Sequence, residues 1–139
     1  MVQFYFLAIC FNLLGGFVLA APHFSEKFPV LSAIREFVYS KKGIRIGLII
    51  SLFLVGILKV ISVSIGDVII VGDLLPSLTL LISGLTLLTE YWYGNRDGVE
   101  KKGVLKKMDG IFVKNSSIVG VAAVVTACLH FLFPGVLFL

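Results

Sequence analysis

The sequence predicts an all-α integral membrane protein with four transmembrane helices. Hydrophobic residues make up 58% of the 139 residues and charged residues only 14%, and the mean hydropathy is +1.06. A soluble domain carries about 25% charged residues. The apolar residues fall into four segments of about 20 residues each, the length that crosses a hydrocarbon core of roughly 30 Å. Little remains for a soluble domain, so we expect residues 1–139 to form a single transmembrane domain.

We expect the four spans at residues 3–21, 44–65, 68–90 and 116–139. Only the short turn Gly66-Asp67 separates the second span from the third, so these two spans must form a hairpin. Val18-Leu19-Ala20 resembles a signal-peptide cleavage site, but the residues before it contain no Lys or Arg. A signal peptide begins with positive charge. We therefore expect the first helix to remain uncleaved.

The distribution of basic residues predicts the orientation. All Lys and Arg residues except Arg45 and Lys59 lie in the loops 22–43 and 91–115, and the outer turn and both termini carry none. Short loops rich in Lys and Arg stay in the cytoplasm. We therefore expect cytoplasmic loops and extracytoplasmic termini, in the cell (inner) membrane of a bacterium or archaeon. The bases expected at the membrane surface, where anionic lipid would attract them, are Lys41, Lys42, Arg45, Lys101, Lys102, Lys106 and Lys107.

Each cytoplasmic loop contains an amphipathic pattern. Apolar residues at i, i+1, i+4, i+7 and i+8 begin at Val30 in the first loop and at Val104 in the second. This spacing places them on one face of a helix. We expect short interfacial helices at residues 29–39 and 103–113. Each half of the chain then contains span, interfacial helix and span, which predicts two parallel repeats related by an axis along the membrane normal.

Small residues recur at helical spacing within the spans. In lipid, helices associate through close packing at such residues and through shared polar contacts. The positions that we expect to pack are Ala8, Gly16 and Ala20 in the first span, Gly56 in the second, Gly84 in the third, and Gly120, Ala123 and Ala127 in the fourth. Every span therefore has a side suited to face its neighbours.

Four polar residues share these faces: Asn12, Lys59, Asp73 and His130. The topology places all four in the extracytoplasmic half, and the hairpin brings Lys59 and Asp73 to similar depth. A charge inside the membrane is costly, so an ion pair between the two is expected. The layer can be structural, fixing the hairpin register, or it can bind an ion, a proton or a substrate. Asp67, at the outer turn, can form an acidic mouth or simply serve as a turn residue.

The sequence contains no known catalytic signature such as GxSxG, HExxH or a Walker motif. We therefore expect no enzyme, no catalytic residues, no cofactor, no metal site and no nucleic-acid partner. The favoured function is a non-enzymatic subunit or scaffold of a homo-oligomeric or larger membrane complex, with lipids and other membrane subunits as partners. The alternative is a small ion- or proton-coupled transporter or channel that uses Lys59, Asp73 and His130.

Overall fold

The computed structural model describes residues 2–61, 74–94 and 103–133, and within these ranges the chain is helical with no strand. The helices are α1 (Val2–Phe24), α2 (Pro29–Ser40), α3 (Lys42–Ile61), α4 (Leu74–Gly94), α5 (Val104–Met108), the π-helix η1 (Asp109–Val113) and α6 (Ser116–Leu132). The predicted all-α fold class is thus confirmed for the described residues.

Three helices are long and apolar enough to cross a membrane, namely Gln3–Phe24, Lys42–Ile61 and Leu74–Tyr93. A fourth span is obtained if Lys106–Val113 and Ser116–Leu132, which are bent by 50° to each other, are counted as one. The expected ends of the spans at 62–65, 68–73 and 134–139 lie outside the described residues. So do Asp67, Asp73, Lys101 and Lys102.

The first loop contains one helix, at the position of its amphipathic pattern. α1 continues through Pro22 to Phe24, three residues beyond the expected end, and a short turn leads to α2. Pro29 occupies the start of α2, where its fixed φ suits a helix and its missing N–H needs no partner. α2 ends at Ser40, and the extended backbone of the next residue, Lys41, turns the chain into α3.

The second loop is less regular than the first. Residues 103–113, expected as one interfacial helix, form the short α5 and then the π-helix η1. In η1 the Lys114 N–H donates to the Asp109 carbonyl at 3.1 Å, a bond that spans five residues. Gly110 lies inside this turn, and glycine has a low helix propensity. Short π segments are a recognised local departure from the α-helix.

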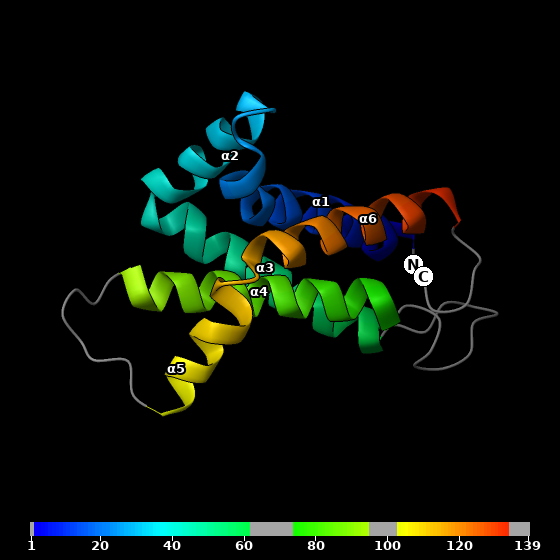
Figure 1. Cartoon of the computed structure of the whole chain (residues 1–139). Helices are drawn as coiled ribbons and strands as arrows, with labels where there is room; N and C mark the ends of the chain where they lie inside the picture. Colours follow the sequence, from blue (N-terminus) through cyan, green and yellow to red (C-terminus); the bar gives the residue numbers. More distant parts are fainter. Residues whose placement is uncertain (1, 62–73, 95–102, 134–139) are drawn as a thin grey trace.

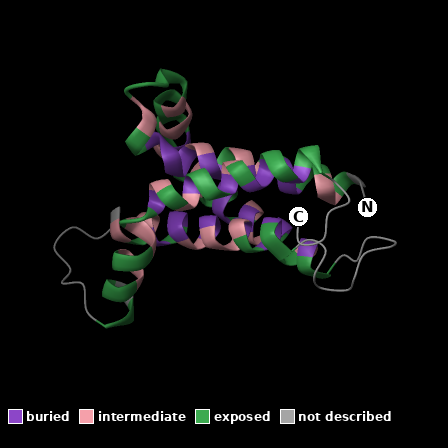
Figure 2. Cartoon of the chain, turned by 45° about the vertical axis from the view of Figure 1, so that its right-hand side comes forward, coloured by how far each residue is buried: buried purple, intermediate pink, exposed green. Residues whose placement is uncertain are grey.

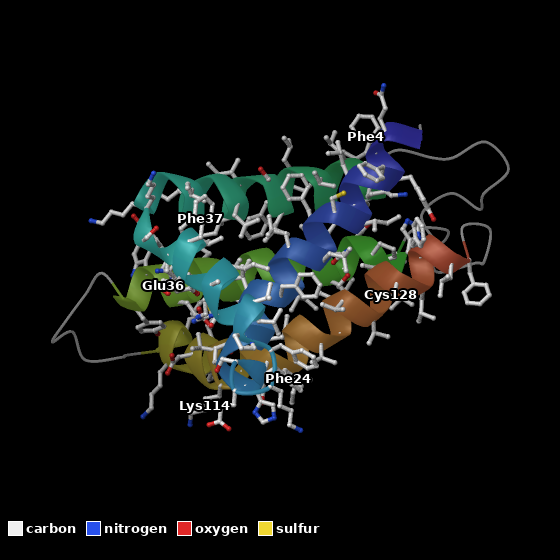
Figure 3. All side chains as sticks on the ribbon, turned by 90° about the horizontal axis from the view of Figure 1, so that it is seen from above. Phe4, Phe24, Glu36, Phe37, Lys114 and Cys128 are labelled. Atoms are coloured by element: carbon white, nitrogen blue, oxygen red, sulfur yellow. The ribbon has the colours of Figure 1, made fainter. Side chains whose placement is uncertain are left out.

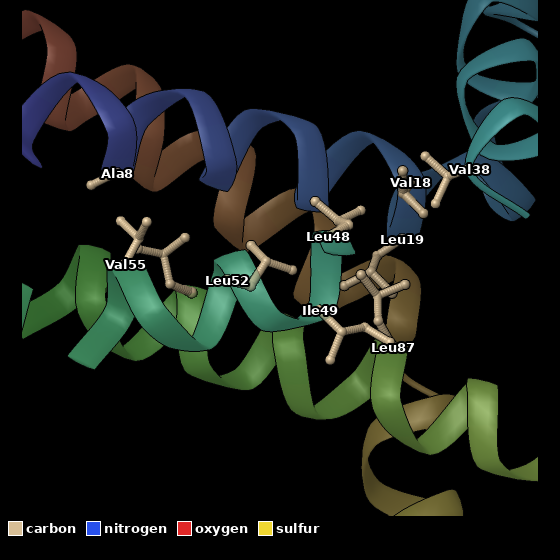
Figure 4. Packing of buried hydrophobic residues seen from close by; sticks show 10 residues of the cluster. Ala8, Val18, Leu19, Val38, Leu48, Ile49, Leu52, Val55 and Leu87 are labelled. Atoms are coloured by element: carbon tan, nitrogen blue, oxygen red, sulfur yellow. The ribbon is translucent and has the colours of Figure 1, made fainter. Parts of the chain in front are cut away.

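The long helices pack in pairs, α1 most extensively on α6 and α3 on α4. Burial is concentrated on the faces that meet inside the bundle (Figure 2). Within the apolar cluster, Figure 4 shows Ala8 facing Val55, and Leu19 close to Leu87. α2 and α5 project from one end of the bundle on opposite sides of it, and we call this end the loop end (Figure 1). The start of α1 lies beside the last turns of α6 at the other end, the far end.

Candidate functional site

Asn12 ties α1 to α4 near the far end. Its side chain is completely buried, and its Nδ2 donates to the Pro76 carbonyl at 3.2 Å. The Thr79 hydroxyl lies 2.9 Å from the Asn12 Oδ1 and can donate to it. A buried amide that uses both its donor and its acceptor across an interface stabilises the packing and specifies the register of the two helices.

Lys59 and His130 meet α1 at the same end of the bundle. Lys59 is 3% exposed and its Nζ lies 5.3 Å from the centroid of the Tyr5 ring. The Tyr5 hydroxyl donates to the His130 carbonyl, and the two rings are tilted by 45° with centroids 4.3 Å apart. His130 is 1% exposed. The ammonium group over an aromatic face is a cation–π arrangement.

These residues form what we call the far-end polar layer: Tyr5, Asn12, Lys59, Thr79 and His130. The sequence spacing singled out three of them, and the fourth residue of the expected layer, Asp73, lies outside the described residues. Tyr5 and Thr79 were missed. Tyr5 lies seven residues before Asn12, two helical turns along the same face, and this spacing could have indicated it.

The small-residue stripes of α1 and α6 meet at Gly16 and Gly120. Ala8, Gly16 and Ala20 are buried, as are Gly120, Ala123 and Ala127. A Cβ on Gly120 would lie 2.5 Å from the Ala20 backbone nitrogen and 2.6 Å from the Gly16 carbonyl oxygen. The two backbones are therefore in direct contact. This approach is the small-residue crossing that favours helix association in lipid.

The glycines of α3 and α4 have a different environment. A Cβ on Gly56 would lie 3.0 Å from the Leu81 side chain, and one on Gly84 would lie 3.2 Å from the Phe53 ring. In each case the glycine receives a large side chain from the partner helix. In the α3–α4 pair, large side chains of one helix therefore pack against glycines of the other, whereas α1 and α6 pack backbone to backbone.

A second polar cluster, which the sequence reasoning missed, lies at the loop end. Arg35 of α2 forms an ion pair with Glu90 of α4, with Nη2 and Oε2 3.1 Å apart. Its other terminal nitrogen, Nη1, donates to the Val18 carbonyl at 2.7 Å. Pro22 lies four residues after Val18 and has no N–H to give to that carbonyl within α1. Arg35 thus supplies a donor that the proline cannot.

Tyr39 completes the contact between α2 and α4. Its hydroxyl donates to the same Oε2 of Glu90 that Arg35 binds. Burial raises the pKa of the Tyr39 phenol above its ordinary value, and the negative charge of Glu90 raises it further. The phenol therefore remains neutral and acts as a hydrogen-bond donor.

Arg45 lies between two aromatic rings of the cluster. Its Cζ is 3.9 Å from the Tyr39 ring centroid and 5.3 Å from that of Tyr91. Its Nε is buried and has no hydrogen-bond partner among the described residues. We name Arg35, Tyr39, Arg45, Glu90 and Tyr91 the loop-end cluster. The i, i+4 spacing of Arg35 and Tyr39 was visible in the sequence, but their partner Glu90 is more than 50 residues away.

The other bases have a more open setting. Lys41, Lys42, Lys106 and Lys107 are exposed at the loop end. Among the described residues, no group of three His, Cys, Asp or Glu side chains is placed to hold a metal ion. Both cysteines, Cys10 and Cys128, are free and exposed. The two polar clusters bring together cationic groups, hydroxyls and the carboxylate of Glu90.

Comparison with known proteins identifies a family but no activity. A family model for a domain of unknown function matches residues 1–130 of the chain. No curated protein matches the chain, and no solved structure does.

Proposed function

We infer the function of this chain from the premise that it belongs to the family of unknown function whose model matches residues 1–130. We propose that it is an integral membrane protein of four membrane-crossing segments. In this proposal it acts without catalysis, as a subunit or scaffold of a homo-oligomeric or larger membrane complex.

The distribution of side chains supports insertion in a membrane. On the outer face of α3, Ile50 is 59% exposed and Leu54 is 56% exposed. Inside the bundle, Asn12, Lys59 and His130 are almost completely buried. Water would favour the reverse arrangement, because exposed apolar surface and buried charge are both costly in it. If hydrocarbon surrounds the helices, the exposure of apolar side chains on their outer faces is favourable.

The arrangement of the short helices supports the proposed orientation. α2 and α5 lie at the same end of the bundle (Figure 1), and the exposed bases Lys41, Lys42, Lys106 and Lys107 belong to this end. Under the positive-inside rule this end faces the cytoplasm. The start of α1, at the far end, then lies outside.

The pairing of the helices supports two parallel repeats. A two-fold axis along the membrane normal would exchange α1 with α4 and α3 with α6. It would therefore convert the α1–α6 contact into the α4–α3 contact, and these are the two most extensive helix contacts among the described residues. The same axis would exchange α2 with the α5–η1 segment, and the two project from opposite sides of the bundle (Figure 1).

The observation that carries the scaffold proposal is the tightly packed middle of the bundle. In the apolar core, Leu19, Leu52 and Leu80 are completely buried. There α1 and α6 touch backbone to backbone at Gly16 and Gly120. Close packing of this kind gives a rigid unit with apolar outer faces that are available to neighbouring subunits.

The test is the native assembly of the full chain. We expect extraction into a polymer-bounded membrane disc, followed by native mass measurement, to give a protein mass well above the 15.2 kDa of one chain. Ile50→Trp on α3 and Leu129→Trp on α6 each place a bulky side chain on a different exposed face. A specific assembly should dissociate with one of them and survive the other. A monomer in native membranes would overturn the proposal.

A transporter or channel is the second candidate, favoured by the buried Lys59 and His130 of the far-end polar layer. Proton or ion flux into vesicles that contain the purified chain tests it, with Lys59→Met and Asp73→Asn as variants. The exposed Lys41→Met is the matched control for loss of a positive charge. Flux that both intramembrane substitutions leave unchanged excludes this function.

A further inference from the structure

An apolar groove runs beside the first turns of α2. It has a volume of about 340 Å³, in the range of about 300–1,000 Å³ typical of ligand pockets. Three elements form its walls: α1, the turn into α2 with its first residues, and α6. Representative lining residues are Phe17, Phe24, Phe28, Leu31, Val121 and Val125. Every residue that lines the groove is apolar.

The groove is held open by the loop-end cluster. Arg35 connects α2 to Glu90 of α4 and to the Val18 carbonyl of α1, and Tyr39 adds a second bond to Glu90. These contacts determine where α2 lies across the bundle, so α2 cannot move to fill the groove without breaking them. Phe28 and Val30 at its edge are 59% and 69% exposed.

Basic residues lie next to groove-lining residues along the chain. Lys27 directly precedes Phe28, and His23 directly precedes Phe24, and both are exposed. The antiparallel register of α1 and α6, which pairs Gly16 with Gly120, brings the end of α1 to the start of α6. Figure 3 shows Phe24 and Lys114 at the same edge of the molecule. Glu26 is the one acid at residues 22–29, against the two ammonium groups of Lys27 and Lys114.

We propose that this groove binds one acyl chain of an anionic phospholipid, with the head-group phosphate at Lys27 and Lys114. The proposal rests on the membrane insertion proposed above. An acyl chain suits a wall without polar groups, whereas an extended peptide in the same groove would bury backbone N–H and C=O groups without partners. The ammonium groups of the two lysines complement the phosphate charge at the depth where an interfacial helix lies.

The experiment measures which lipids stay with the full chain. The protein is reconstituted in an equimolar mixture of phosphatidylcholine and phosphatidylglycerol, extracted gently, and examined by native mass spectrometry for bound lipid. A lysine near an anionic lipid contributes about a five-fold preference. We therefore expect phosphatidylglycerol to be enriched roughly twenty- to thirty-fold over phosphatidylcholine in the lipid that remains bound.

Two pairs of variants assign that lipid to the groove. Val121→Trp fills the groove, whereas Ile118→Trp places the same side chain at an exposed position of α6 outside it. The double variant Lys27→Gln/Lys114→Gln removes the head-group charges. Lys41→Gln/Lys42→Gln removes equal charge at the other end of α2. We expect the first member of each pair to lose the enrichment and the second to keep it.

The outcomes separate this inference from the membrane proposal. A chain that does not partition into membranes overturns both. A chain that inserts but retains the two lipids equally, or keeps its enrichment in Val121→Trp, overturns the groove alone. A polypeptide found in place of lipid also overturns it. The double lysine variant changes only exposed side chains, so it tests the head-group contact even if Val121→Trp fails to fold.

Discussion

The contact between α1 and α6 at Gly120 allows a quantitative prediction. In Gly120→Ala the new Cβ would lie 2.5 Å from the Ala20 nitrogen, 2.6 Å from the Gly16 oxygen and 2.9 Å from the Leu19 carbonyl carbon. All three atoms belong to backbone, so no side-chain rotation relieves the overlap. The helices must separate by roughly 0.5–1 Å, which forfeits a quarter to a half of the dispersion energy along the crossing.

Overpacking of this kind costs about 1–3 kcal/mol, and rigid backbone on both sides favours the upper end. Replacing glycine by alanine within a helix stabilises the helix by up to about 1 kcal/mol, because alanine has the higher helix propensity. We therefore expect Gly120→Ala to lower the free energy of unfolding by about 2 kcal/mol, which corresponds to roughly a thirty-fold shift in the unfolding equilibrium.

The assay is reversible unfolding in mixed micelles with increasing dodecyl sulfate, followed by circular dichroism and by the fluorescence of Trp92, the only tryptophan. Gly47→Ala is the matched control, because a Cβ at Gly47 would meet nothing within 4 Å. We expect this control to be neutral or slightly stabilising. Gly16→Ala should be less than additive with Gly120→Ala, because one displacement of α1 accommodates both methyl groups. Equal stability of Gly120→Ala and Gly47→Ala would refute the backbone contact.

Three further predictions concern the polar clusters. Arg35→Ala should destabilise the docking of α2 by about 1–2 kcal/mol. The loss should be smaller in the Pro22→Ala background, because the alanine N–H can bond the Val18 carbonyl there. Hydrogen exchange of the α2 amides measures the loss in each background. The raised pKa of the Tyr39 phenol favours its neutral form in the folded protein. The stability that Tyr39 contributes is therefore complete below the ordinary pKa of about 10, and it is lost only as pH rises through the pKa of the folded state. Ultraviolet titration should show no Tyr39 phenolate at about pH 10. Asn12→Leu should cost about 1 kcal/mol in the unfolding assay, because it removes the bonds that join α1 to the Pro76 carbonyl and the Thr79 hydroxyl and leaves these groups bonded only within α4.

Each of these predictions has an outcome that contradicts it. Equal effects of Arg35→Ala in both backgrounds would mean that Arg35 does not compensate for Pro22. A titration step near pH 10 that Tyr39→Phe abolishes would place the phenol in water. Asn12→Leu with unchanged or higher stability would show that the amide contributes nothing to the α1–α4 contact.

The helical periodicity of the sequence was sufficient to locate the helices and much of their buried face. Ala8, Asn12, Gly16 and Ala20 are related by steps of four residues, and all four are buried in the structure. The amphipathic pattern from Val30 likewise coincides with α2. Such inferences succeed because helical spacing is a local property and helices pack closely through small and polar side chains on one face.

The loop-end cluster could not be found in this way. The sequence groups Arg45 with the bases of the membrane surface, and only the structure shows that its guanidinium stacks on Tyr39 and Tyr91. The bond from Arg35 to the Val18 carbonyl depends on Pro22 and on where α2 crosses α1. These contacts join elements whose crossing angle and depth depend on the packing of the whole bundle.

The sequence by itself therefore determined an all-helical chain with apolar helices long enough to cross a membrane, because length, composition and periodicity are local properties of the sequence. Only the tertiary structure decided that α1 meets α6 in backbone contact and that Arg35 and Tyr39 share the carboxylate of Glu90. It also decided that α2 leaves an apolar groove beside α1 and α6. Each of these features is a distance between residues far apart in the chain, and such distances arise from packing, which no local pattern specifies.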